Sequence, residues 1–178
     1  MADVHDPETR SRNMAAIRGS DTKPELLIRK LLHRQGFRYR LHDRLLLGKP
    51  DLVFLKFRAV LFVNGCFWHG HDCPQFHWPK SREDFWREKI GGNVRRDLRN
   101  EAVLSTAGWR IGLIWECAIK GPGRLPVGEV IDNAAAFLEG SGMHFSIQGQ
   151  SVDRFTEQTA GHDAGSGGRA FLRKTPCG

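Results

Sequence analysis

Residues 51–63 of this chain read DLVFLKFRAVLFV and contain two short runs, 51–55 and 59–63, that are mostly apolar. Both runs are rich in β-branched and aromatic residues, and the tripeptide Lys56-Phe57-Arg58 separates them. This composition and spacing predict a β-hairpin. The second run is apolar throughout, which is typical of a strand in the middle of a sheet.

Helical patterns lie on both sides of this hairpin. Before it, Thr22 can cap a helix that has Pro24 in its first turn and that ends at Gly36. After it, the chain predicts a helix over 81–106, a buried strand over 109–115 and an amphipathic helix over 130–138. We therefore expect an α/β fold, with a mixed central sheet of three or four strands flanked by helices.

Composition divides the chain into three parts. Residues 1–20 are polar and basic and predict an N-terminal arm, with a short helix around residues 13–18. Residues 21–140 hold the periodic segments and predict the folded domain. Beyond residue 140, Gly, Ser, Gln and Thr dominate, so we expect residues 141–178 to form a flexible C-terminal tail.

The charge balance indicates the kind of partner. The 178 residues carry 27 Lys and Arg against 20 Asp and Glu, a net charge of +7. Such an excess favours a polyanion, because neutralised phosphates release counterions, although a solvated basic surface is the alternative. No apolar run is long enough to span a bilayer and no secretory signal is present, so we expect a cytoplasmic protein without a membrane partner. In the cytosol, four cysteines indicate metal binding or free thiols.

Three soft metal ligands lie close together in an irregular segment, in the pattern Cys66-x4-His71-x-Cys73. Cys117 follows the predicted strand over 109–115 and can supply a fourth ligand. Three cysteines and one histidine are a usual ligand set for structural zinc. In the alternative interpretation, Cys117 is a buried core thiol and His71 a surface residue. Cys177 is not expected to take part.

A candidate hydrolytic site lies at Pro50-Asp51, directly before the first strand of the hairpin. Pro-Asp at a strand entry opens the PD-(D/E)XK nuclease pattern, in which the carboxylate holds Mg²⁺ at a phosphodiester. Pro-Asp is also a common turn, and the acidic residue and lysine expected on the next strand are absent. His69 is the candidate in their place, because an imidazole is a competent general base near neutral pH. As an alternative, it is a polar loop residue.

Several motifs in order over residues 1–140 resemble the very-short-patch repair (Vsr) endonucleases. They are MADVHDPETRSRNMAAIR at 1–18, GKPD at 48–51, NGCFWHGHDC at 64–73, FWREKI at 85–90, Asn93-x3-Asp97, GWR at 108–110 and WEC at 115–117. The resemblance implies a PD-(D/E)XK (restriction-endonuclease-like) fold with a modified catalytic site and the structural zinc site described above. It also implies hydrolysis of one DNA strand 5′ to the thymine of a T·G mismatch, which arises by deamination of 5-methylcytosine.

The resemblance also implies roles for individual residues. Asp51 and the main-chain carbonyl of Val63 would bind the catalytic Mg²⁺, and His69 would be the general base. Glu25 and Asp97 would hold metal-bound waters. Glu25 can instead serve only the helix N-terminus, since it stands at the capping-box position. Asp97 can instead belong to a solvated helix face.

Aromatic residues in two motifs match those with which the Vsr family opens the DNA stack. They are Phe67, Trp68 and Trp86, and an alternative for Trp86 is packing in the core. Unstacking a wobble pair costs less than unstacking a matched pair, and inserted aromatic rings recover stacking energy. Asn64 departs from the pattern, because the best-known members have a histidine there. Asparagine can still hydrogen-bond a metal-bound water or a phosphate, but it does not titrate.

Two other functions remain open from the sequence. The first is a Vsr-like nicking nuclease of relaxed or different specificity that acts on foreign DNA. The second is a zinc-stabilised DNA-binding module whose catalytic site is weakened, for which Asn64 is the only support. For the mismatch endonuclease, we expect a bacterial monomer that associates with the nucleoid when bound to DNA, with mismatch-repair proteins of the MutL kind as a further partner.

Overall fold

The computed structural model describes Thr9 and residues 20–151 of the chain, and its centre is a five-stranded mixed sheet. The strands, in spatial as in chain order, are β1 (Arg40–Leu41), β2 (Leu52–Phe54), β3 (Ala59–Asn64), β4 (Arg110–Trp115) and β5 (His144–Ile147). β1, β2 and β3 pair antiparallel, whereas β4 pairs parallel with both β3 and β5. The mixed sheet is confirmed, but the expected count of three or four strands is wrong.

The predicted hairpin is confirmed as β2 and β3, with Leu52 opposite Leu61 in the register. A 3₁₀ turn, η1 (Leu55–Phe57), connects the strands, and Arg58 closes it in the left-handed conformation with φ 46°. The Arg58 side chain donates to the carbonyls of Ala107 and Gly108, just before β4 begins, over 2.7 and 3.0 Å. The turn therefore fixes where β4 enters the sheet beside β3.

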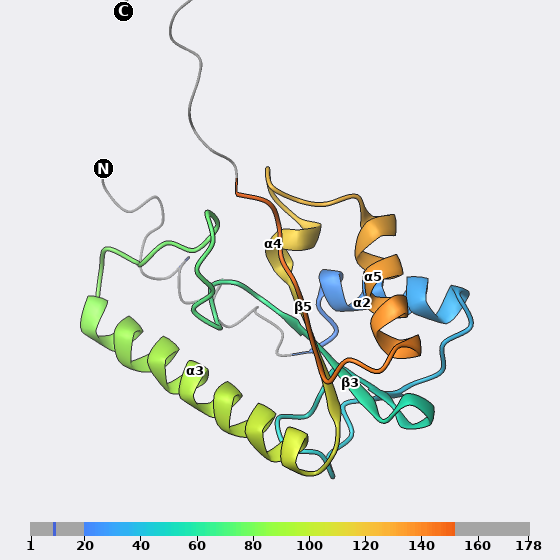
Figure 1. The fold of residues 1–178 in the computed structure, drawn as a ribbon. Coiled ribbons are helices and arrows are strands. Elements are labelled where there is room, and N and C mark those ends of the chain that lie inside the picture. The colour runs from blue at the N-terminus through green and yellow to red at the C-terminus, as the bar shows by residue number, and fades with distance from the viewer. Residues whose placement is uncertain (1–8, 10–19, 152–178) are drawn as a thin grey trace, which may run out of the picture.

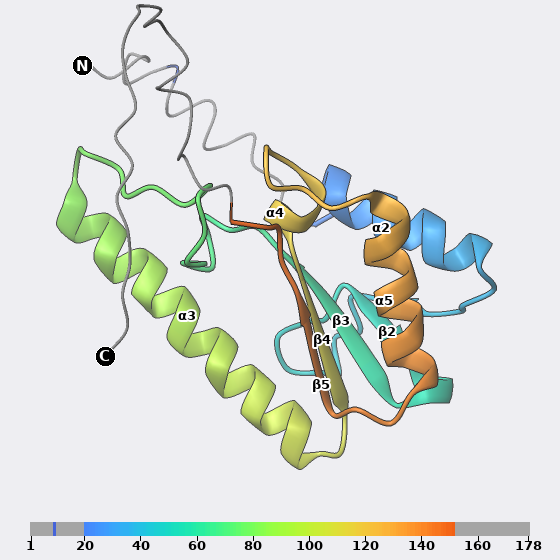
Figure 2. The same ribbon diagram turned by 45° about the horizontal axis from the view of Figure 1, so that its top comes forward.

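Helices cover both faces of the sheet (Figures 1 and 2). α2 (Lys23–Arg34) and α5 (Val127–Glu139) lie on one face, and α3 (Glu83–Thr106) lies on the other. Successive side chains along a strand therefore point to opposite faces of the sheet and pack in different cores. Leu52 and Phe54 pack in the larger core with α2 and α5, whereas Val53 packs with Leu104 of α3 in a smaller one. Each fully buried aliphatic side chain of this kind stabilises the fold by about 1.5–3 kcal/mol.

The helix N-terminus predicted at Thr22 is confirmed. Thr22 caps α2 by accepting from the Glu25 backbone N–H over 3.4 Å, and Pro24 lies in the first turn. The chain leaves α2 at Gly36, whose φ of +95° is one that L side chains rarely adopt. This helix therefore carries Glu25 at a fixed place beside the entrance to β2.

Ordered structure continues beyond residue 140, where the sequence predicted the start of a flexible C-terminal tail. Residues 144–147 form β5 instead of part of a flexible tail, and Ile147 is buried. Phe145 stacks on Phe137 of α5, with ring centroids 5.3 Å apart. A four-residue edge strand with two exposed residues carries too little hydrophobic pattern to be recognised from sequence.

Two predicted segments lie mainly outside the described residues. They are the N-terminal arm, with its helix around residues 13–18, and residues 152–178, which include Cys177. Within the part of the chain that is described, none of the helices combines the length and apolar character needed to cross a bilayer.

Candidate active site and metal centre

An open cleft of about 1170 Å³ lies at the carboxyl end of β3. The sheet supplies its floor, α2 and the loop before β2 one side, and α3 and the loop after β3 the other. The predicted site residues that line it are Glu25, Asp51, Val63, Asn64, Trp68, His69 and Trp86. A smaller hollow adjoins it, and His69 lines both, whereas Asp97 lines only the second.

Asp51 is the residue directly before β2, and its side chain lines the cleft with only 17% of its surface exposed. Its Oδ2 accepts a hydrogen bond from the Val63 backbone N–H over 2.7 Å, which ties it to the neighbouring strand β3. Burial raises the pKa of Asp51 to about 6, and the hydrogen bond from Val63 opposes that rise. A buried carboxylate that is costly to ionise favours a bound cation.

His69 and Asp97 form a pair at the other wall of the cleft. His69 Nδ1 lies 2.7 Å from Asp97 Oδ2, and each side chain is less than one-third exposed. A carboxylate at Nδ1 holds the imidazole proton there and leaves Nε2 as the basic nitrogen. The resemblance implied that Asp97 holds metal-bound water, and that role stays a prediction. In the structure, the contact that Asp97 makes is with the His69 imidazole.

Glu25 caps the helix in the structure, and its predicted role toward a metal-bound water stays a prediction. Its Oε2 accepts from the Asp21 backbone N–H over 2.8 Å, and its Oε1 accepts from the Thr22 hydroxyl over 2.9 Å, so it serves the N-terminus of α2. The side chain is buried, yet the residue also lines the cleft beside Asp51. The capping contacts therefore hold the Glu25 carboxylate at the edge of the cleft that Asp51 also lines.

Arg29 and His42 also belong to the site, and no motif in the sequence predicts either of them. Arg29 is buried and donates from Nη2 to Glu25 Oε2 over 3.0 Å and toward His42 Nε2 over 2.8 Å. Its Nη1 pairs with Asp21 and lowers the pKa of that carboxyl. His42 Nδ1 in turn lies 3.8 Å from Asp51 Oδ1. No sequence pattern signals this, since His42 lies in an irregular loop and its contacts are all tertiary.

The ligand atoms of Asp21, Glu25 and His42 lie within 4.8 Å of one another, as in a cation site. The guanidinium of Arg29 contacts all three side chains. A permanent positive charge therefore already neutralises this cluster, and the geometry favours a supporting network for Asp51 over a separate metal site.

The aromatic residues predicted to enter the DNA form one cluster at the cleft. The Phe67 ring lies 5.1 Å from that of Trp68 and 5.3 Å from that of Trp86, in edge-on arrangements. All three side chains are partly exposed, so Trp86 is not part of the core. Asn93 of α3 donates to the Trp68 carbonyl over 2.8 Å and anchors the loop to the helix.

Asn64, the departure from the family pattern, is the last residue of β3 and is buried. It lines the cleft next to Val63. Its predicted hydrogen bond to a metal-bound water or a phosphate stays a prediction.

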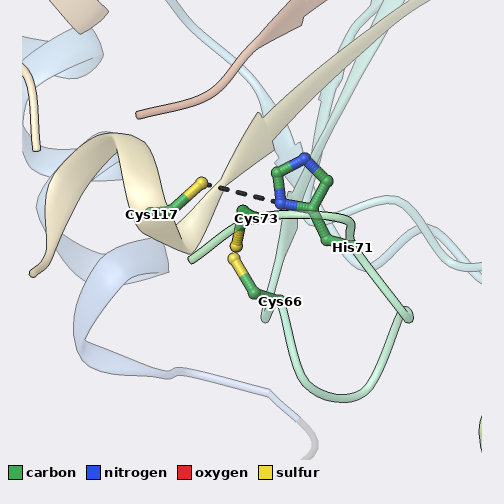
Figure 3. Close-up of side chains that lie close together, drawn as sticks. All are labelled: Cys66, His71, Cys73 and Cys117. Atoms are coloured by element: carbon green, nitrogen blue, oxygen red, sulfur yellow. Dashed lines mark hydrogen bonds between the residues drawn. The ribbon is translucent and has the colours of Figure 1, made fainter. Parts of the chain in front are cut away.

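A second cluster lies behind the loop that carries His69. The ligand atoms of Cys66, His71, Cys73 and Cys117 lie within 4.8 Å of one another, and Figure 3 shows the loop side chains converging on Cys117. Cys117 comes from α4 (Glu116–Ile119), the short helix after β4. His71 is 8% exposed, so the alternative of a surface histidine is wrong.

The geometry of this cluster fits a tetrahedral ion. His71 Nδ1 lies 3.6 Å from Cys117 Sγ. An ion bound to nitrogen at about 2.0–2.1 Å and to sulfur at about 2.3 Å at the tetrahedral angle would hold those two atoms about 3.6 Å apart. Burial raises the pKa of both the Cys66 and the Cys117 thiols, a cost that a bound cation offsets by stabilising the thiolates. The residues present therefore fit a metal ion with soft ligands.

Comparisons with known proteins agree with this geometry. The family model "DNA mismatch endonuclease Vsr" matches residues 2–75. The DNA mismatch endonuclease Vsr of Escherichia coli is 43% identical over 152 residues, which cover 85% of this chain and 97% of that protein. The type II nicking enzyme V.NmeAIP of Neisseria meningitidis is 48% identical over 67% of this chain and 86% of its own, and V.XorIIP of Xanthomonas oryzae is 48% identical over 70% and 92%. The chain therefore belongs to the Vsr family of DNA mismatch endonucleases.

Proposed function

We propose that this chain nicks one strand of double-stranded DNA on the 5′ side of the thymine in a T·G mismatch, with Mg²⁺ as cofactor. The observation that carries the proposal is the cleft itself. Asp51 and the imidazole of His69, held by Asp97, line the same cleft as Trp68 and Trp86. A metal-binding carboxylate, a base and a stacking surface thus meet in a space open to a nucleic acid.

Asp51 and the Val63 carbonyl would hold the magnesium ion, and Glu25 would hold water bound to it. The ion would neutralise charge on the scissile phosphate and on its leaving oxygen. Burial suits Asp51 to this task, because a desolvated carboxylate gains more from a cation than an exposed one does.

His69 would be the general base. Its Nε2 would take a proton from the attacking water as the water oxygen bonds to phosphorus and the bond to the 3′ oxygen breaks, and the 3′ oxygen would take a proton from solvent water. The products are a 5′-phosphate and a 3′-hydroxyl. Asp97 would stabilise the imidazolium through the 2.7 Å contact to Nδ1. In this proposal Asp97 positions the base through Oδ2, and its other oxygen, Oδ1, would hold metal-bound water.

The surroundings of the cleft fit a distorted duplex. Arg44, Lys49 and Lys89 line it and can pair with DNA phosphates. Phe67, Trp68 and Trp86 would insert beside the mismatch, where a wobble pair is easier to unstack, and would recover about 1–3 kcal/mol of stacking energy per base.

We propose Zn²⁺ as the ion of the Cys66, His71, Cys73 and Cys117 cluster. Three cysteines and a histidine at tetrahedral separation form a closed structural site without an open position for water. Such a site would hold the loop with Phe67, Trp68 and His69 against the sheet.

A nicking assay on labelled duplexes tests the function. With Mg²⁺, the protein should cut one strand of a T·G duplex at the thymine and leave the matched T·A duplex intact. Asp51→Asn and His69→Ala should both slow this cut severely while leaving duplex binding measurable. Equal cutting of the matched duplex would refute the mismatch requirement, and binding without any nick would refute the hydrolytic role.

A second candidate function rests on the similarity to type II nicking enzymes. Here the chain nicks DNA in another sequence context, or with a relaxed mismatch requirement, against foreign DNA. A panel of matched, mismatched and methylated duplexes separates the two functions. For the repair function we also propose a monomer in the bacterial cytoplasm that engages mismatch-repair proteins of the MutL kind.

A further inference from the structure

We propose that residues 148–150, directly after β5, form an outer shell of the Cys66, His71, Cys73 and Cys117 site, with Gln148 as the positioning residue of His71. This inference rests on the proposal that the cluster binds zinc. It assigns a role to a segment that composition alone placed in a flexible tail.

The Gln148 side chain fixes which nitrogen of His71 faces the cluster. Gln148 Oε1 lies 2.8 Å from His71 Nε2. An amide oxygen only accepts hydrogen bonds, so the imidazole proton resides on Nε2. This leaves the lone pair of Nδ1 directed at the cluster, where Cys117 Sγ lies 3.6 Å away. Histidine ligands in proteins are commonly held in this way by an acceptor on the other ring nitrogen.

Gly149 contacts the cluster at Cys117. Its backbone N–H donates to Cys117 Sγ over 3.3 Å, a bond that stabilises negative charge on that sulfur. The position has no room for a side chain. A Cβ atom at residue 149 would come closer than van der Waals contact to the carbonyl oxygens of Cys117 and Gly123. Glycine is therefore what lets the backbone approach the sulfur.

Contacts at both ends hold the segment in place. Ile147 is buried and pairs in register with Ile114 of β4, and the Gln150 N–H donates to the Gly123 carbonyl over 2.8 Å. On the other side of His71, the Trp115 ring stacks on the imidazole with centroids 3.9 Å apart and planes at 6°. Contacts with Trp115, Gln148 and Cys117 thus hold the His71 side chain in place without a bound ion.

The arrangement bears on catalysis through the shared loop. His69 is two residues before His71, and its ring centroid lies 6.5 Å from that of Trp115. A looser metal site would therefore loosen the backbone that carries the proposed base.

The test compares Gln148→Leu with Gln148→Glu, which removes or retains the acceptor at one exposed position. Purified proteins are first analysed for bound zinc and for native far-ultraviolet circular dichroism. Zinc release to an excess of a chromogenic chelator is then followed. We expect release about 10–100-fold faster from Gln148→Leu than from wild type, and release within a few-fold of wild type from Gln148→Glu.

A second variant, Gly149→Ala, probes the Cys117 contact, and the absorption of the cobalt-loaded protein reports the ligand geometry. We expect this spectrum to change in Gly149→Ala and in Gln148→Leu. Wild-type release rates and an unchanged cobalt spectrum in Gln148→Leu would overturn the role of Gln148, even if zinc is bound. A wild-type protein that binds neither zinc nor cobalt would instead refute the zinc proposal.

Discussion

Asp97 Oδ2 lies 2.7 Å from His69 Nδ1. The two residues are 28 positions apart in the sequence, and α3 and the loop after β3 bring them together. The geometry is that of a histidine oriented by a carboxylate, with the second ring nitrogen left to exchange a proton. This contact fixes the orientation of the His69 imidazole.

Replacing Asp97 with asparagine should slow nicking of a T·G duplex by about 10²–10⁴-fold, because the amide keeps the shape but cannot stabilise an imidazolium. Single-turnover rates measure the effect, and duplex affinity should change little. Glu101→Gln, one turn further along α3, is the matched control and should nick at nearly the wild-type rate. A wild-type rate in Asp97→Asn would remove Asp97 from the mechanism.

Asp51 should make the metal-free protein less stable as pH rises. The folded state keeps the Asp51 proton up to about pH 6, whereas the ordinary pKa is 3.8, so the folded state binds more protons between these values. The free energy of unfolding therefore falls as pH rises through this window, by about 3 kcal/mol in total. Below the window the contribution vanishes.

Denaturant unfolding of Asp51→Asn and wild type in magnesium-free buffer measures this. The variant should match wild type at pH 3.5 and be more stable at pH 8, by up to about 3 kcal/mol. Asp132→Asn, on the exposed face of α5, should show no such pH-dependent difference. A constant difference between Asp51→Asn and wild type across this range would contradict the burial cost. Added Mg²⁺ should stabilise wild type more than the variant.

Arg29→Met should destabilise the protein by about 3–5 kcal/mol, because it leaves the buried Glu25 carboxylate without its cation. Urea unfolding measures the loss, and Arg34→Met, an exposed arginine of the same helix, is the control. Because His42 loses its partner as well, the nicking rate of Arg29→Met should fall even where the protein is folded. Stability equal to that of Arg34→Met would show that the network contributes nothing.

Trp86→Ala should reduce discrimination between T·G and matched duplexes. If the ring stacks on a base at the mismatch, its removal should cost about 1–3 kcal/mol of binding to the mismatched duplex and less for the matched one. Equilibrium binding without Mg²⁺ separates this from catalysis. Leu98→Ala removes an exposed apolar side chain from the same helix and should leave the preference intact. An equal loss for both duplexes would assign Trp86 to general DNA contact.

Local patterns in the sequence were sufficient for part of this structure. The hairpin of β2 and β3 follows from two β-rich runs at short spacing, and Thr22 marks a helix start with its own side chain. The Cys66, His71 and Cys73 spacing indicated a metal cluster because those ligand types rarely gather on one loop without a metal.

Other features depend on contacts between distant segments. β5 is short and half exposed, and it forms only because β4 offers a free edge. Arg29 fits an ordinary helical pattern in the sequence. Its contact with His42 exists only because the fold places α2 beside the loop that carries His42. The role proposed for Gln148 depends on its contact with His71, which is 2.8 Å away in space but 77 positions away in the sequence.

In the proposed mechanism, Asp51 and His69 act on the same phosphate in the same step. Single-turnover nicking of a T·G duplex by Asp51→Asn, His69→Ala and the double variant tests it directly. If the two residues work as one unit, the double variant should be about as slow as the slower single variant. If either single variant nicks at the wild-type rate, or if the double variant is slower by the full product of the two effects, Asp51 and His69 do not act together in one step.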